Sequence, residues 1–131
     1  MNTKKIKINV ETKKAIKLKK PVVYIPVPMY RCCVELYFGK QTKEVETHWK
    51  SDMNYDGKTR NYLETSRSVM ITFVEEKPKL STVVHELLHA TQMIMAGAGH
   101  KCLEKDGSDE PSAYLLTFLF EEYCKIKKLK V

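Results

Sequence analysis

Alternation of apolar and polar residues dominates the first half of the chain and predicts β-strands. It extends across residues 5–19, which are expected to form a hairpin or two short strands. Runs of β-branched and aromatic residues predict further strands at residues 22–27, 33–38 and 69–74. Prolines within and beside the first of these runs favour an edge strand or an extended lead-in over a central strand. Residues 40–62 contain turn formers such as Asn54 and the pair Asp56-Gly57, so a loop or a weak hairpin is expected there.

The period of the pattern changes to that of a helix after Pro78. Apolar positions then recur at three- and four-residue spacing, which predicts a helix from about Leu80 to Ala96 that ends at two glycines. A polar loop follows, and a second, very apolar helix is expected to begin near Asp109 or Glu110. The circumference of this second helix is apolar enough that most of it is expected to be covered.

The length of 131 residues and the apolar content of 43% indicate one globular domain, residues 1–131, with residues 1–20 as a lysine-rich hairpin or extension. No apolar run approaches the roughly 20 residues that a membrane helix needs. The basic N-terminus is not followed by the apolar segment of a secretory signal. A cytoplasmic protein without a membrane partner is therefore expected.

The formal charge of +7 arises from 23 basic and 16 acidic residues, and lysines crowd both ends of the chain. Such a balance can attract nucleic acid or acidic protein surfaces. Lysines on an edge strand or in the last turn of a helix are also ordinary solvated residues, and no nucleic-acid-binding motif accompanies them. The cysteines lack the spacing of a thiolate zinc site and are expected to be reduced and mostly in the core; they are Cys32, Cys33, Cys102 and Cys124.

The first predicted helix contains the segment His85-Glu86-Leu87-Leu88-His89. Residues four apart differ by about 40° around a helix and by about 6 Å along it. The imidazoles of His85 and His89 therefore leave the same face and can bind one metal ion. Glu86 lies beside this pair, where its carboxylate can accept a proton from a water on the metal. A helical histidine is more often a packed or surface residue, but the position of the motif beside the apolar stripe favours a zinc site.

Catalytic zinc requires a third protein ligand and an open position for water. A metzincin has a histidine six residues after the second one, but Met95 stands there and Gln92 replaces a required glycine, which excludes that class. Glu110 is the preferred third ligand because it opens a helix with a polar stripe along an otherwise apolar surface. Complementing the helix dipole is the alternative role for this carboxylate. The next candidate is Asp109, followed by His100, Glu104 and Asp106.

Tyr114 is a candidate for transition-state stabilisation. It lies one turn after Glu110, in the polar stripe that consists of Glu110, Tyr114, Thr117 and Glu121. From there its hydroxyl can donate a hydrogen bond to a developing oxyanion. A supporting or core position is the alternative for Tyr114, and His100 is expected at most to line the cleft.

The paired segments LSTVVHELLHATQ and DEPSAYLLTFLFEEY resemble small zincin-like metallopeptidases encoded by bacteriophages. The upstream segments VPMYRCCVELYFGK and SVMITFV are similar to the strands that precede the helix in those proteins. The resemblance covers roughly residues 22–123 and implies a minimal gluzincin-like fold acting in the cytoplasm of a host cell. It also implies zinc ligands at His85, His89 and Glu110, with Glu86 as the catalytic base. Larger gluzincins have an aspartate four residues beyond the ligand glutamate, where this chain has Tyr114.

We therefore expect an α+β, minimal zincin-like domain in which a small, mainly antiparallel sheet packs against the HExxH helix and a second, C-terminal helix. The expected activity is zinc-dependent hydrolysis of a peptide bond in a protein or peptide by water that Glu86 activates. The alternative is a zinc-containing or inactive zincin-fold binding module that acts on a host protein or nucleic acid through its basic surface. A third possibility is a peptidase directed at one regulator, similar to zincins that cleave phage repressors.

Overall fold

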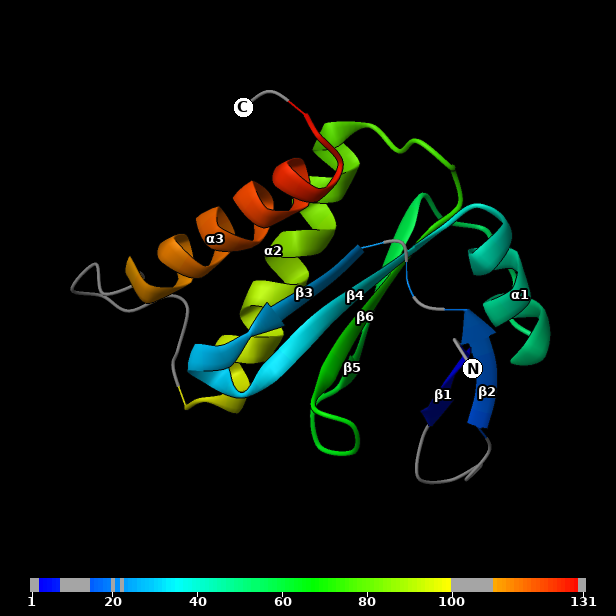
Figure 1. Ribbon diagram of the computed structural model, residues 1–131, viewed down its shortest axis with the longest axis horizontal. Helices are drawn as coiled ribbons and strands as arrows, with labels where there is room; N and C mark the ends of the chain where they lie inside the picture. The colour runs from blue at the N-terminus through cyan, green and yellow to red at the C-terminus, as the bar shows by residue number, and fades with distance from the viewer. Residues whose placement is uncertain (1–2, 8–14, 20, 22, 100–109, 130–131) are drawn as a thin grey trace.

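Figure 1 shows the computed structural model, which describes residues 3–7, 15–19, 21, 23–99 and 110–129. Within these residues the chain has an α+β architecture with a four-stranded sheet, a separate two-stranded sheet and three α-helices. The strands are β1 (Thr3–Lys7), β2 (Ala15–Lys19), β3 (Val23–Val27), β4 (Cys32–Phe38), β5 (Gly57–Tyr62) and β6 (Ser68–Phe73). The helices are α1 (Lys40–His48), α2 (Leu80–Gly97) and α3 (Glu110–Ile126), and a 3-10 turn, η1 (Pro28–Tyr30), follows β3.

The four-stranded sheet has the strand order β3-β4-β6-β5. Its central strands β4 and β6 run parallel, whereas β3 and β5 pair antiparallel with them at the two edges. The expected α+β class is confirmed, and the sheet is mixed. Pro26 lies in β3, and a proline without an N–H group is tolerated at a sheet edge. The strands β1 and β2 pair antiparallel with each other in a sheet of their own.

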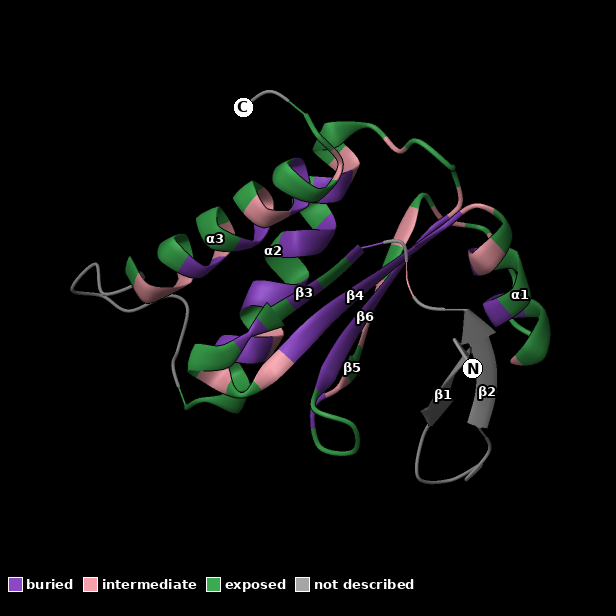
Figure 2. Cartoon of the chain, in the orientation of Figure 1, coloured by how far each residue is buried: buried purple, intermediate pink, exposed green. Residues whose placement is uncertain are grey.

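The main hydrophobic core lies between one face of the sheet and the helices α2 and α3 (Figures 1 and 2). Successive strand residues point to opposite faces, so every second residue of β4 and β6 faces these helices. Helix α2 contacts β5 and β6, and α3 contacts β3 and α2. The fully buried core residues include Val34, Leu36, Val69, Ile71, Phe73, Val83, Leu87, Ala90 and Leu119. This burial fixes α2 firmly against the β5 side of the sheet.

Helix α1 covers part of the opposite face, where Tyr37 and Met70 pack against Val45. The prediction of a loop or weak hairpin over residues 40–62 was wrong for α1 and missed that β5 belongs to the main sheet. Val45 is the single apolar residue in the nine-residue α1, so no apolar stripe marks it as a helix. Tertiary contacts position it instead, among them a 2.7 Å hydrogen bond from the Thr42 hydroxyl to the carbonyl of Phe73.

A buried ion pair ties α1 to β5. Arg60 Nη2 donates a hydrogen bond to Glu46 Oε1, and the Glu46 side chain is 1% exposed. The guanidinium lies over the ring of Trp49, 4.5 Å from its centroid. Glu46 Oε2 has no hydrogen-bond partner within the described residues. Beside the pair, the hydroxyls of Tyr55 and Thr72 lie 3.0 Å apart, and burial raises the pKa of Tyr55 to about 12.

Helix α3 begins at Glu110 as predicted, but the expectation that most of its circumference is covered was wrong. Leu115 and Leu119 on one side of the helix are buried, whereas Tyr114 on the other side is 72% exposed. The helix lies in the outer layer (Figure 2) and contacts β3 and α2 on one side only. Its polar stripe is therefore a solvent-exposed surface; all four of its residues, Glu110, Tyr114, Thr117 and Glu121, are exposed.

Candidate metal centre

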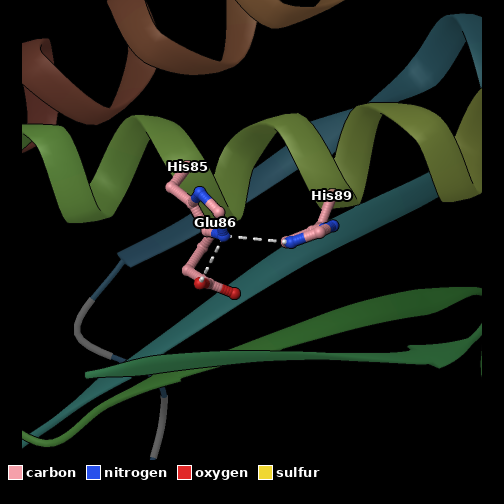
Figure 3. A group of neighbouring side chains, drawn as sticks. All are labelled: His85, Glu86 and His89. Atoms are coloured by element: carbon pink, nitrogen blue, oxygen red, sulfur yellow. Dashed lines mark hydrogen bonds and ion pairs between the residues drawn. The ribbon is translucent and has the colours of Figure 1, made fainter. Parts of the chain in front are cut away.

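Two histidines near the middle of α2 lie side by side on its surface (Figure 3). The Nε2 atoms of His85 and His89 are 3.2 Å apart, and the two rings meet edge to face at 81°. Both residues are exposed, while the neighbouring Glu86 is buried. The possible ligand atoms of these three residues all lie within 4.8 Å of one another. The helical spacing thus brings together the three residues of the HExxH segment.

The separation of the two ring nitrogens fits a tetrahedral zinc site. With Zn–N bonds of about 2.05 Å and a tetrahedral angle, two histidine nitrogens lie about 3.3 Å apart. The observed separation of 3.2 Å matches this value. The same distance also fits an N–H···N hydrogen bond between two neutral rings. Metal analysis distinguishes the two cases, since only the first requires an ion.

Glu86 is anchored to the sheet by one of its carboxylate oxygens. The residue is 5% exposed, and the Thr59 hydroxyl of β5 lies 2.7 Å from Glu86 Oε1 and 3.3 Å from its backbone carbonyl oxygen. The other oxygen, Oε2, lies 3.9 Å from His85 Nε2. The carboxylate is therefore held between the strand and the histidine pair, beside the pair as its position in the sequence indicates.

Gly57, the first residue of β5, provides the space that the Glu86 side chain occupies. A Cβ atom at this position would lie 2.7 Å from Glu86 Cγ and 3.2 Å from a ring carbon of Phe73. Neither Gly57 nor Thr59 was predicted from the sequence as part of the site, because the pair Asp56-Gly57 suggested only a turn. A glycine at a strand position often marks a close approach, which is a signal for Gly57. No comparable signal marks Thr59.

The structure does not bring Glu110 into this group. Glu110 is exposed at the start of α3, and the described residues that form the group are the two histidines and Glu86. Figure 3 shows the three labelled side chains on the side of α2 that faces the strands, with α3 beyond the other side. The role of Glu110 as third ligand stays a prediction. The alternative ligands His100, Glu104, Asp106 and Asp109 lie outside the described residues.

Tyr114 does not line the pocket that borders His85 and Glu86. It borders an apolar groove of about 570 Å³ between η1 and the start of α3, together with Met29, Pro111 and Phe118. The side chain is largely exposed there. The predicted contribution of Tyr114 to an oxyanion site is not supported by a contact with His85, Glu86 or His89 and stays a prediction.

A polar pocket of about 380 Å³ opens beside His85 and Glu86. Its other lining residues are Asp56 and Gly57 at the start of β5, and Ser81 and Thr82 in the first turn of α2. The pocket is open to solvent, so water has access to the carboxylate of Glu86. The hydroxyls of Ser81 and Thr82 and the carboxylate of Asp56 are hydrogen-bonding groups in its wall.

The described cysteines take no part in the group. Cys33 and Cys124 are buried, Cys32 is partly buried, and all three are free thiols. Burial raises the pKa values of Cys32 and Cys124, so both thiols stay protonated at neutral pH. These features agree with the expectation of reduced, mostly core cysteines. The remaining one, Cys102, lies outside the described residues.

Across the part of the chain that the structure describes, no helix is both long and apolar enough to cross a membrane. Comparisons with protein families, with curated proteins and with solved structures gave no match to the chain.

Proposed function

We propose that this protein is a zinc-dependent hydrolase that cleaves peptide bonds, similar in type to the small gluzincin-like metallopeptidases of bacteriophages. The observation that carries the proposal is the 3.2 Å approach of the Nε2 atoms of His85 and His89 beside the buried carboxylate of Glu86. Two imidazoles one helical turn apart can supply two metal ligands, and an adjacent carboxylate can supply the general base of metal-assisted hydrolysis. The free thiols are consistent with activity in the reducing cytoplasm.

Each residue has a distinct role in this proposal. His85 and His89 would hold the ion, and Glu110 is proposed as the third ligand on the basis of the sequence pattern. A zinc ion bound there would lower the pKa of a water molecule and polarise the substrate carbonyl. Glu86 Oε2 takes the proton from the attacking water and then delivers it to the leaving amine. The hydroxyls and carboxylate of the polar pocket bind the substrate next to Glu86.

The first test replaces the general base without removing its size. Glu86→Gln is expected to lower kcat/KM by about 100- to 10,000-fold, because the amide cannot accept the proton. Bound zinc is expected to be unchanged. The assay measures cleavage of a proteome-derived peptide library by mass spectrometry with zinc-loaded protein. The control is Glu64→Gln, an exposed glutamate in the turn after β5 that is expected to retain full activity. Undiminished hydrolysis by Glu86→Gln would contradict the proposal.

The second test concerns the ion. Purified wild-type protein is expected to bind zinc with 1:1 stoichiometry, and His85→Ala is expected to lose it, since one of its ligands is gone. The matched control is His48→Ala, which removes an exposed histidine at the end of α1. The measurement is the zinc content of wild type, His85→Ala and His48→Ala by metal analysis. A wild-type protein without stoichiometric zinc, or equal zinc in wild type and His85→Ala, would contradict the metal assignment.

The alternative of a binding module receives little support from two of the three described lysines near the C-terminus. The ammonium of Lys125 lies 3.0 Å from a Glu122 oxygen, and that of Lys127 lies 4.7 Å from the ring centroid of Phe38. These cations already have partners within the chain. A binding module would nevertheless keep its biological effect in Glu86→Gln and lose it when the terminal lysines are removed, whereas a peptidase would show the opposite pattern.

A further inference from the structure

One hydroxyl group connects the proposed general base to the sheet. Thr59 Oγ1 lies 2.7 Å from Glu86 Oε1 and 3.3 Å from the Glu86 carbonyl oxygen. The hydroxyl carries a single proton, and the shorter distance and the charge of the carboxylate both favour donation to Oε1. Within the described residues, Thr59 is the one hydrogen-bond donor to this carboxylate. A buried carboxylate depends strongly on such a donor.

We infer that Thr59 is a positioning residue, which determines the oxygen of Glu86 that receives the proton from the attacking water. This inference rests on the proposed function. The hydrogen bond occupies Oε1 and directs it towards β5. It thereby leaves Oε2 on the side of His85, 3.9 Å from the ring Nε2, where the attacking water is activated. The proton leaves water, binds Oε2, and later moves to the leaving amine, so Glu86 ends the cycle unprotonated.

The rigidity of Thr59 supports this role. It lies in the middle of β5, and its partner in the antiparallel pairing with β6 is Ile71, which is fully buried. The strand residue is therefore fixed by the ladder and by the core. Glutamate has a long side chain with several rotatable bonds, and without a fixed donor its carboxylate can adopt other orientations. A side chain on a rigid strand holds a catalytic group more accurately than one on a loop.

Two substitutions separate the hydroxyl from the shape of the side chain. Thr59→Val keeps the branched shape and removes the hydroxyl, whereas Thr59→Ser keeps the hydroxyl. We expect Thr59→Val to lower kcat about 10- to 100-fold, because a misplaced catalytic group loses that much rate. Substrate KM and bound zinc are expected to stay unchanged, and Thr59→Ser is expected to restore kcat to within about threefold of wild type. The peptide is the best substrate from the library assay.

Thr91→Val is the matched control. Thr91 is a fully buried threonine on α2 whose hydroxyl donates to the backbone carbonyl of Leu87 at 2.8 Å, away from the carboxylate. Its replacement is expected to leave kcat unchanged. If Thr59→Val has the wild-type kcat, or if Thr59→Ser is as slow as Thr59→Val, the inference is overturned while the proposed function stands. If Glu86→Gln hydrolyses peptides at the wild-type rate, or if the zinc-loaded wild type hydrolyses none, both are overturned.

A measurement on metal-free protein tests the contact without any activity. Thr59→Val is expected to lower the urea midpoint of the wild-type chain, because it leaves the buried carboxylate without its donor. In a Glu86→Met background, where no carboxylate remains, the same change is expected to have little effect on the midpoint. An equal decrease in both backgrounds would show that Thr59 acts on packing alone and would overturn the inference.

Discussion

The replacement Gly57→Ala tests how closely β5 approaches Glu86. The glycine does not need the left-handed backbone region, so an added methyl group has only a steric effect. The new Cβ would lie 2.7 Å from Glu86 Cγ, whereas ordinary contact begins at 3.4 Å. Glu86 would have to move by about 0.7 Å, the difference between these two distances. Phe73, at 3.2 Å from the added atom, is fully buried and prevents the methyl group from being accommodated on its other side.

The loss of stability in Gly57→Ala is expected because the added methyl group overpacks the core. Insertion of a methyl group into a filled space costs about 1–3 kcal/mol, and the displaced carboxylate is expected to lose its hydrogen bond to Thr59. Displacement of a catalytic group on this scale is expected to lower kcat by about 100-fold. Gly97→Ala is the matched control, because its added Cβ would meet one atom at 3.5 Å, an ordinary contact, in the last turn of α2. That change is expected to stabilise the protein by about 0.4–1 kcal/mol.

Urea denaturation of both alanine variants and the peptide assay measure these effects. We expect opposite changes in the free energy of unfolding, a decrease for Gly57→Ala and an increase for Gly97→Ala. Only the first variant is expected to lose activity. A Gly57→Ala protein as stable and as active as wild type would show that β5 does not confine Glu86, and would refute this description of the site.

Further predictions concern the buried ion pair, the metal and a thiol. Arg60→Met is expected to lower the free energy of unfolding by about 3–5 kcal/mol, because it leaves the Glu46 carboxylate buried and unpaired. Adding Glu46→Leu to the same chain is expected to recover much of this loss. If urea denaturation shows that the losses of the two single variants add up in the double variant, the result argues against the ion pair. Zinc at 100 times its Kd is expected to stabilise the wild-type protein by about 2.7 kcal/mol but to leave the stability of His89→Ala unchanged. If zinc raises the Tm of both proteins equally, specific binding at the histidine pair is excluded. Burial and a raised pKa predict that Cys124 reacts with iodoacetamide at pH 8 far more slowly in folded than in urea-unfolded protein, so equal rates by mass spectrometry would contradict its burial.

The parts of the fold that the sequence predicts are those in which one apolar pattern decides the structure. Helix α2 was predicted from Leu80 to about Ala96, and in the structure it extends to Gly97. It was predictable because its apolar stripe, visible in the sequence, packs against the sheet. Strands β4 and β6 are buried on both faces and were recognised from their apolar runs. Helix α1 was not predictable, because its position depends on distant partners such as the Phe73 carbonyl and Arg60.

The candidate site likewise has a part that the sequence predicts and a part that it does not. His85, Glu86 and His89 come together through helical spacing alone, which sequence shows directly. Thr59 is 27 residues from Glu86, and their contact depends on the packing of α2 against β5 and on the register of β5 with β6. The polar stripe of α3 suggested a buried functional surface but is exposed, because an outer helix needs only one apolar side.

Every role proposed for this site depends on the binding of one metal ion by both His85 and His89 beside Glu86. A crystal structure of zinc-loaded protein with anomalous scattering measured at the zinc edge would show whether this binding occurs. We expect one anomalous peak about 2.1 Å from Nε2 of both histidines, with Glu86 Oε2 on the same side of α2. The contradicting result is an anomalous map without a peak at the pair, in which the two rings hydrogen-bond only to each other.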